Sequence, residues 1–368
     1  MNTLSHVAFC GGGSGGHLSP AIAIAQELLQ RDAEIRFTFL TSSRPIDRRV
    51  LEVSGLPGES FDHIALPLIT SSGRTRYAVN AVRSFLKCRS QFLRCPPDVA
   101  IGTGGFASLP GVCAAHRLRI PIMLLELNTI PGAANRFLSR FAKVTCTGWN
   151  MDDCWQQRWT GQLCRVGVPI RREFCSGLSG KPDGHPDGRP LLLILGGSQG
   201  ANFVNAMTTS AVAQSADGLR GWRIVHQAGG DGRVGVKEFY DRHSITADVV
   251  DFVDHVPQML AEADIVISRC GAVTLAEIAA VGRASLLIPL ASASDDHQTA
   301  NAALFEAVNA AIIIREDRPD AQVDLAQQLQ SLCASLTTRQ RMATSALSLA
   351  PSNSAAVIAD LLRRLLIE

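Results

Sequence analysis

The chain has 368 residues, of which 46% are hydrophobic and 18% are charged, and its formal net charge at pH 7 is +2. This length allows two packed domains, and the near-neutral charge gives no reason to expect nucleic acid as a partner. Ten cysteines are scattered without a Cys-x-x-Cys pair. That pattern excludes a disulfide framework and a zinc site of paired ligands, and it favours reduced, cytosolic thiols.

The amino terminus, residues 1–6, lacks the basic segment of a signal peptide. The chain also has no run of 18 uncharged apolar residues, the length needed to cross a bilayer. We therefore expect a soluble protein that can still bind a membrane surface.

A glycine-rich loop is the most informative feature near the amino terminus. Five of the six residues in 11–16 are glycine, and the loop lies between an apolar run, 7–10, and a helical pattern that begins at Leu18. A strand, a glycine turn and the start of a helix together present backbone N–H groups to an anion. A second loop of this kind, 196–201, follows the apolar run 191–195. We therefore predict two nucleotide-binding folds.

Strand-like and helix-like segments alternate along the chain, as is typical of parallel sheets with crossover helices. Residues 176–190 are rich in turn formers and predict an exposed loop just after a domain boundary. A final helix at about 354–366 is predicted to pack back on the first domain. We predict strands at 7–10, 35–40, 98–102, 120–125, 143–146, 191–195, 222–227, 249–253, 263–268, 284–289 and 311–314.

Two known nucleotide motifs can be tested against the glycine loops. Residues 11–16 match G-x-G-x-x-G, but the NAD fingerprint also needs an acidic residue at the end of the second strand. Here Glu34 precedes that strand and Asp47 lies beyond it, which disfavours NAD. No Gly-Lys-Ser/Thr follows a glycine run, so a Walker loop is excluded. A third glycine loop, 102–111, follows another predicted strand, and three such loops favour a ligand cleft.

Two side chains near these loops have alternative interpretations. His17 is either a polar residue at a helix end or a general base that takes a hydroxyl proton near neutral pH. Thr274 and Glu277 have the spacing of a capping box. A carboxylate in that place can instead accept hydrogen bonds from ribose hydroxyls, so both interpretations stay open here.

Other polar residues follow predicted strands. Glu126 and Asn128 come after 120–125, and the segment 295–301 carries amide and imidazole groups suited to sugar hydroxyls. The sequence has no zinc-type histidine cluster and no Asp-x-Asp at a strand end, so we predict no bound metal. A diphosphate would then be met by backbone N–H groups, helix dipoles and Arg171.

The segment 74–94 predicts a basic amphipathic helix. Its basic residues recur at intervals of seven, four and seven, which places them on one helical face with apolar residues on either side. Such a helix is either an ordinary surface helix or an interfacial helix that meets anionic lipid headgroups. The basic residues are Arg76, Arg83, Lys87 and Arg94, and the apolar ones are Ala78, Val82, Phe85, Leu86, Phe92 and Leu93.

Taken in order, these motifs resemble those of the MurG family of peptidoglycan glycosyltransferases. That family moves N-acetylglucosamine from UDP to undecaprenyl-linked muramyl-pentapeptide (lipid I) and so makes lipid II. The resemblance covers nearly the whole chain, and the order of the motifs is more specific than any one of them. The matching segments are 11–17, 102–106, 126–128, 196–201, 269–277 and 296–302.

The resemblance implies a GT-B fold, with two Rossmann-like parallel-sheet domains that face a central cleft. The first domain would be 1–166, completed by a carboxyl-terminal helix at about 352–368, and would bind the acceptor and the membrane. The second would be 167–351 and would bind the UDP-sugar. No cofactor or metal is implied.

The resemblance also implies roles for individual residues. Ser14, Gly15 and Gly16 would approach the diphosphate and sugar. Asn128 would contact N-acetylglucosamine, and Arg171 and Ser198 would address the diphosphate. In the second domain, Val253 would offer backbone groups to uracil, Glu277 would hold the ribose, and Gln298 would read the sugar. The phosphates would be cradled by the loop of Ala272, Val273, Thr274, Leu275 and Ala276.

The implied reaction is a direct displacement that inverts the anomeric centre and needs a base for the acceptor's 4-hydroxyl. His17 is the first candidate for this base and Glu126 the second. The partners would be UDP-GlcNAc, lipid I, anionic phospholipid at the cytoplasmic membrane face, and other cell-wall synthesis proteins. Two departures stand out: the family commonly has His and Gln at the positions of Leu125 and Leu127, and Ser at Cys270.

Three other functions remain as alternatives. One is a related glycolipid glycosyltransferase that uses UDP-glucose or UDP-galactose. Another is a UDP-sugar 2-epimerase, which the basic amphipathic helix disfavours. The third is a non-catalytic UDP-sugar-binding protein, which would have no need of His17.

Overall fold

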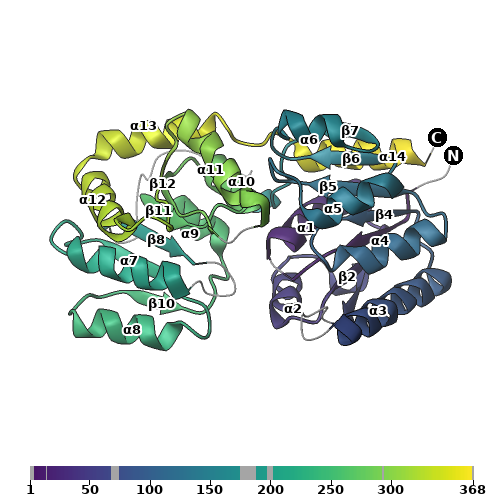
Figure 1. Ribbon diagram of the computed structural model, residues 1–368, viewed down its shortest axis with the longest axis horizontal. Coiled ribbons are helices and arrows are strands. Elements are labelled where there is room, and N and C mark those ends of the chain that lie inside the picture. Colours follow the sequence, from purple (N-terminus) through teal and green to yellow (C-terminus); the bar gives the residue numbers. More distant parts are fainter. Residues whose placement is uncertain are drawn as a thin grey trace. The chain divides into compact units, whose positions relative to one another are not determined.

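The computed structural model describes residues 4–13, 15–67, 74–174, 188–196, 202–291 and 294–366. Contacts within the chain divide it into two compact units. The first comprises residues 1–172 and 351–368, and the second residues 173–350. Each unit is an α/β layer structure with its own sheet (Figure 1).

The first unit contains a seven-stranded sheet in the order β3-β2-β1-β4-β5-β6-β7. Every pair of neighbouring strands is parallel. The central strands are almost entirely buried and apolar, as expected when helices cover both faces of a parallel sheet. The strands are β1 (His6–Cys10), β2 (Arg36–Ser42), β3 (Phe61–Leu66), β4 (Val99–Gly102), β5 (Ile122–Glu126), β6 (Val144–Thr147) and β7 (Gln162–Arg165).

The helices of the first unit alternate with its strands. They are α1 (Gly15–Arg31), α2 (Pro45–Glu52), α3 (Arg74–Arg94), α4 (Ser108–Arg117), α5 (Ala133–Leu138), α6 (Asp153–Arg158) and α14 (Ser354–Leu365), with short 3-10 turns η1 (Gly58–Ser60) and η2 (Ser139–Phe141). The last helix, α14, packs against α1, where Arg31 forms ion pairs with Asp360 at 2.5 Å and Glu27 at 2.7 Å.

The second unit contains a six-stranded parallel sheet in the order β10-β9-β8-β11-β12-β13. Its strands are β8 (Leu191–Leu195), β9 (Arg223–Gln227), β10 (Asp248–Val250), β11 (Ile265–Ser268), β12 (Ala284–Leu287) and β13 (Ala311–Ile313). Its helices are α7 (Asn202–Gln214), α8 (Arg233–Arg242), α9 (Val256–Glu262), α10 (Ala272–Val281), α11 (His297–Ala307), α12 (Ala321–Ala334) and α13 (Leu336–Leu347). The 3-10 turns are η3 (Arg172–Phe174), at the junction of the units, and η4 (Ser294–Asp296).

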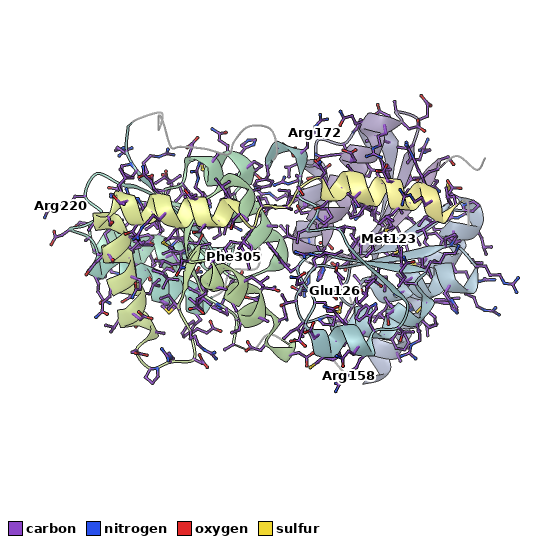
Figure 2. All side chains as sticks on the ribbon, turned by 90° about the horizontal axis from the view of Figure 1, so that it is seen from above. Met123, Glu126, Arg158, Arg172, Arg220 and Phe305 are labelled. Carbon is purple, nitrogen blue, oxygen red and sulfur yellow. The ribbon has the colours of Figure 1, made fainter. Side chains whose placement is uncertain are left out.

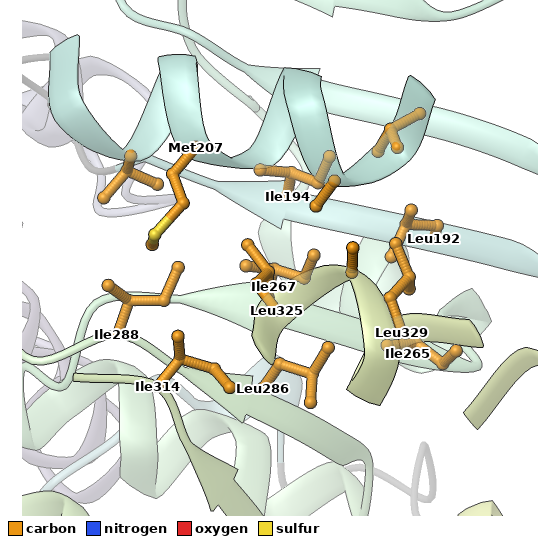
Figure 3. Packing of buried hydrophobic residues seen from close by; sticks show 14 of the residues in the cluster. Leu192, Ile194, Met207, Ile265, Ile267, Leu286, Ile288, Ile314, Leu325 and Leu329 are labelled. Carbon is orange, nitrogen blue, oxygen red and sulfur yellow. The ribbon is translucent and has the colours of Figure 1, made fainter. Parts of the chain in front are cut away.

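The core of the second unit lies between its sheet and helices α7 and α12. Figure 3 shows Met207 of α7 and Leu325 and Leu329 of α12 among the apolar side chains of β8, β11 and β12. This close packing fixes the strand ends, from which the loops of the candidate site depart.

The two parallel Rossmann-like sheets confirm the predicted fold class. All the predicted strands are present, although β10 ends at Val250 rather than Val253. Two further strands, β3 and β7, were not predicted. Both are the edge strands of their sheet, and edge strands face solvent, so their mixed polar sequences carry no continuous apolar signal. Most of the predicted loop at 176–190 lies outside the described residues.

Candidate functional site

The first glycine loop leaves the carboxyl end of β1, next to that of β4, where the strand order of the first sheet reverses. Ligands of open α/β sheets bind at such points. Gly11 donates its N–H to the carbonyl of Leu40 at 3.0 Å, and Thr103 donates to the carbonyl of Cys10 at 2.9 Å. The loop is thus held between β2 and the start of the third glycine loop.

His17 lies in the first turn of α1 and rests on the backbone of the third glycine loop. Its Nδ1 is 3.0 Å from the carbonyl oxygen of Thr103. A Cβ at Gly104 or Gly105 would lie 3.1–3.3 Å from the imidazole ring, and both glycines have left-handed φ, +91° and +70°. Only glycine combines this conformation with room for the ring. Because a carbonyl can only accept, Nδ1 carries the proton of the neutral imidazole and Nε2 carries the lone pair.

Glu126 ends β5 and is 2% exposed. Figure 2 labels it together with Met123, near the beginning of the same strand. One carboxylate oxygen accepts from the N and Nδ2 of Asn128 at 3.0 and 3.2 Å, and the other from Gly132 N at 2.9 Å and Asn135 Nδ2 at 3.0 Å. Burial raises the pKa of the Glu126 carboxyl, and these hydrogen bonds oppose the rise. The carboxylate therefore organises the loop that carries Asn128.

The two family departures beside Glu126 are both buried. Leu125 is 1% exposed and Leu127 is 6% exposed. An apolar residue is compatible with both places, because each side chain packs inside the protein and needs no hydrogen-bond partner.

In the second unit, Gln298 joins two loops at the carboxyl edge of the sheet. It lies at the start of α11, and its Oε1 accepts from Cys270 N at 3.2 Å and Leu290 N at 3.1 Å. These N–H groups follow β11 and β12, respectively. The fully buried Asn301 donates to the carbonyl of Cys270 at 3.2 Å. With its oxygen used in this way, Gln298 has its Nε2 donor left for a ligand.

A largely buried ion pair supports the loops at the same ends of the strands. Arg269 contacts Glu316 at 2.6 Å, with only 13% and 10% of the two side chains exposed. Arg269 also donates to the carbonyls of Ile288 and Pro289, and Glu316 accepts from Ala291 N at 2.6 Å. The pair therefore fixes the loop that leads to Gln298. Sequence reasoning missed it because Glu316 follows β13, far along the chain.

The capping-box interpretation of Thr274 and Glu277 is wrong. Helix α10 begins at Ala272 with Gly271 as its N-cap, so Thr274 is already the third helical residue. Glu277 lies more than a turn into the helix and is 7% exposed. Residues 272–276 form the first turns of α10, at the amino-terminal end of the helix, where the helix dipole favours an anion. This placement suits the predicted contact with phosphates.

The remaining predicted residues are distributed as follows. Gly15 and Gly16 open α1. Ser14 and Ser198 lie outside the described residues. Arg171 belongs to the first unit, unlike the other predicted donor contacts from Val253 onward. Val253 follows β10 and is 6% exposed, so its backbone rather than its side chain is suited to a ligand.

Helix α3 is present as predicted and divides its apolar residues between two faces. Phe92 and Cys88 are buried against the first unit. Val79, Val82, Leu86 and Leu93, spaced three, four and seven residues apart, are 47–57% exposed. The basic side chains of Arg83, Lys87 and Arg94 are exposed beside them, and the side chain of Arg76 lies outside the described part. The helix thus presents an apolar stripe with a cationic border.

Metal and membrane features were sought in the part of the chain that the structure describes. No group of three or more His, Cys, Asp or Glu residues is arranged to hold a metal ion there. None of the helices in that part combines the length and apolar character needed to span a bilayer. The nine cysteines it contains are free thiols.

Two Rossmann-like units, with polar groups gathered at the carboxyl-terminal ends of their strands, have the architecture of the GT-B glycosyltransferases. Family models agree with this class: residues 7–147 match the glycosyltransferase family 28 N-terminal domain and residues 191–362 its C-terminal domain.

Curated relatives narrow the family. A protein of Syntrophotalea carbinolica is 37% identical over 83% of this chain and 84% of its own length, and one of Sorangium cellulosum is 36% identical over 97% and 87%. Both are named UDP-N-acetylglucosamine--N-acetylmuramyl-(pentapeptide) pyrophosphoryl-undecaprenol N-acetylglucosamine transferase. The chain belongs to this family, the MurG family.

Solved structures agree with the assignment. The crystal structure of Acinetobacter baumannii MurG covers 98% of this chain and 99% of its own, with a TM-score of 0.71 and 27% identity. A UDP-N-acetylglucosamine 2-epimerase reaches a TM-score of 0.70 over 100% and 98% of the two chains, but at 12% identity. The second likeness shows a shared fold alone.

Proposed function

We propose that this protein transfers N-acetylglucosamine from UDP-GlcNAc to the 4-hydroxyl of the muramyl sugar of lipid I and so forms lipid II. Family membership supports the substrates. The catalytic part of this proposal rests on the position of His17, whose Nδ1 is hydrogen-bonded to the carbonyl oxygen of Thr103 at 3.0 Å. This bond orients the ring and directs the basic lone pair to Nε2.

In the proposed reaction, the acceptor's 4-hydroxyl oxygen attacks C1 of N-acetylglucosamine. The bond between C1 and the diphosphate oxygen breaks, and UDP leaves with the electron pair. The hydroxyl proton passes to Nε2 of His17. One displacement inverts the configuration at C1, so an α-linked donor yields a β-linked product.

His17 is preferred to Glu126 as the base. The Glu126 carboxylate is buried and already accepts four hydrogen bonds from its own loop. We assign it to positioning Asn128, the proposed contact to the sugar. Ser14, Gly15 and Gly16 complete the proposed ligand contacts of the first unit, together with Arg171.

The second unit is the proposed donor site. Glu277 would hold the ribose, Val253 would pair with uracil through its backbone, and residues 272–276 would bind the phosphates with Ser198. Gln298 would donate to the sugar through Nε2, since Oε1 is occupied by Cys270 N and Leu290 N.

The apolar stripe of α3 and its cationic border are the proposed membrane contact at the cytoplasmic face. Exposed Val82, Leu86 and Leu93 would enter the interface, while Arg83 and Lys87 would meet anionic phospholipid. Vesicle flotation tests this contact: binding should require anionic lipid and be weakened by V82D/L86D. Binding of the variant equal to that of the wild type would contradict the proposal. Other cell-wall synthesis proteins remain proposed partners.

Transfer of radiolabel from UDP-GlcNAc to a short-chain lipid I analogue tests the reaction. The same assay with UDP-glucose and UDP-galactose tests the alternative donors.

The His17→Ala variant tests the role of the base. It should lower kcat by about 100-fold while the affinity for UDP is kept. His243→Ala is the matched control, because the exposed His243 also directs Nδ1 to a backbone carbonyl, at 2.8 Å. Unchanged turnover in the His17 variant would remove it from the mechanism. UDP binding without transfer by the wild type would indicate a binding protein.

A further inference from the structure

We propose that Asp47 and Arg44 are positioning residues for sugar transfer, because they bind the backbone N–H and C=O of Gly13 and so position the first glycine loop before α1. The inference rests on the proposed function, in which α1 carries the base. Neither residue belongs to a glycine motif. The sequence places Asp47 beyond the end of β2, whereas the fold returns it to that strand end.

The Asp47 carboxylate is 1% exposed and is surrounded by donors. Gly13 N lies 2.9 Å from Oδ1 and 2.8 Å from Oδ2. Oδ2 also accepts from Ser42 N at 3.0 Å and from Ser42 Oγ at 2.6 Å. One carboxylate therefore ties the glycine loop after β1 to the end of β2. Hydrogen bonds to a charged acceptor are about twice as strong as neutral ones.

Arg44 holds the carbonyl of the same residue, on the other side of the Gly13 Cα. Its Nη1 donates to the carbonyl oxygen of Gly13 at 2.8 Å. Arg44 directly precedes α2, and Asp47 lies in the first turn of that helix. Residues at the amino-terminal end of α2 thus hydrogen-bond to both the N–H and the C=O of Gly13.

The loop residues before Gly13 are closely packed. A Cβ at Gly12 would lie 2.7 Å from Asp47 Oδ2, and one at Gly11 would lie 3.1 Å from the carbonyl oxygen of Gly104. Gly13 has a left-handed φ of +90°. The loop is therefore packed between Asp47 and the third glycine loop, on which His17 rests. A displacement at Gly13 would be passed to the first turn of α1.

The hydrogen bonds of Asp47 also determine which backbone N–H groups are available to a ligand. The N–H of Gly13 is already bonded to Asp47, so it cannot bind an anion. Among the described residues that follow Gly13, those at the start of α1, beginning with Gly15 and Gly16, have N–H groups suited to a ligand. Asp47 thus selects which part of the glycine loop recognises the substrate.

Asp98 provides a matched control at the opposite edge of the same sheet. Its Oδ2 accepts from Ser5 N, His6 N and Ser5 Oγ at 2.8–3.0 Å. Asp47 and Asp98 thus each hold two backbone N–H groups and one serine hydroxyl. Only Asp47 is next to the proposed site. If carboxylates of this kind serve stability alone, their amide variants should have similar effects on turnover.

The first experiment compares Asp47→Asn with Asp98→Asn. In D47N, the amide oxygen would stay with the donors around Oδ2, while an NH₂ group in the place of Oδ1 would replace one of the two acceptors of the Gly13 N–H with a donor and shift the loop. We expect kcat to fall by about 100-fold, the effect of a small misplacement at a reacting centre. The KM for UDP-GlcNAc should stay within about twofold, since the proposed donor contacts lie mainly in the second unit. D98N should retain wild-type kcat.

The second experiment uses arginines and does not depend on the buried aspartate. Arg44→Met removes the bond to Gly13 O and is expected to lower kcat about tenfold. Arg48→Met on the same helix breaks only a surface ion pair with Glu52, in which 77% of the arginine side chain is exposed. This control should retain wild-type turnover, and both variants should melt close to the wild-type temperature.

Two outcomes would overturn the inference: D47N and D98N with equal turnover, or R44M with the turnover of R48M. If D47N does not fold, the arginine pair decides. A wild-type protein that transfers no sugar would instead refute the proposed function. Normal wild-type transfer with a fully active R44M would overturn this inference alone.

Discussion

The two sheets hold the amino-terminal ends of their strands in the same way and the carboxyl-terminal ends in different ways. These two ends are called the amino edge and the carboxyl edge of each sheet. At the amino edge of the first sheet, Asp98 stands directly before β4 and accepts from the backbone N–H groups that begin β1. In the second sheet, Asp264 stands directly before β11 and accepts from Leu191 N, which begins β8, at 2.9 Å. The same residue type in the same place supports the two central strands of each unit.

At the carboxyl edges, the loops are held by different chemistry. The first unit uses two buried carboxylates, Asp47 and Glu126, which accept loop N–H groups. The second unit uses the amide of Gln298 and the ion pair of Arg269 with Glu316. The comparison teaches that the support at the amino-terminal ends of the strands is repeated, whereas the support at the carboxyl-terminal ends, where ligands are proposed to bind, differs between the units.

The largest effect is expected from Arg269→Met, which breaks the second unit's brace. Glu316, whose side chain is only 10% exposed, would lose its cation, and the carbonyls of Ile288 and Pro289 would lose a donor. The free energy of unfolding of that unit should fall by about 3–5 kcal/mol, measured by urea denaturation. Arg315→Met is the control, because the Arg315–Asp317 pair is exposed and should contribute nothing measurable. Equal losses in both variants would contradict the role of the buried brace.

Glu126→Gln tests the corresponding brace of the first unit. Whichever oxygen becomes an NH₂ group, two of the four donors around the side chain lose their acceptor. We expect a loss of about 2–4 kcal/mol in the free energy of unfolding and a lower kcat, because Asn128 loses its support. Glu34→Gln, at an exposed site, should change neither quantity. A stable, fully active E126Q would show that this loop needs no carboxylate.

The amino edges should respond alike. Asp98→Ala and Asp264→Ala each leave a strand-initiating N–H without its carboxylate, and each should cost about 1–3 kcal/mol in its own unit. Hydrogen exchange of the amides of β1 and β8 measures the two effects separately. Sugar transfer should persist in both variants at a temperature where they are folded. A loss of turnover in either folded variant would contradict the proposal that the amino edges support only the fold.

The smallest effect is expected from Gln298→Glu, which tests whether Nε2 of Gln298 contacts the sugar donor. Gln298→Glu keeps an oxygen for Cys270 N and Leu290 N but replaces the Nε2 donor with an acceptor. Stability should be retained, while the KM for UDP-GlcNAc rises by about tenfold, the worth of one hydrogen bond. Gln340→Glu, exposed on α13, is the control for added charge. An unchanged KM would mean that Nε2 does not touch the donor.

The sequence by itself determined the two parallel sheets, their glycine loops and the family. Buried parallel strands are continuous apolar runs, and glycine loops between a strand and a helix are local patterns that need no knowledge of distant residues. The edge strands β3 and β7 were not predicted, because strands at the side of a sheet need no continuous apolar run. The helix 74–94 was also readable, since amphipathic spacing is local.

Only the tertiary structure decided how the site is held. Asp47 reaches Gly13 across 34 residues of chain, and Arg269 reaches Glu316 across 47. Glu126 is a candidate base from the sequence, and only the fold shows that its carboxylate accepts four hydrogen bonds from Asn128, Gly132 and Asn135. Thr274 had the spacing of a cap, but α10 begins before it. Hydrogen bonds between distant residues depend on where the strands end in space, and no local pattern along the chain records that.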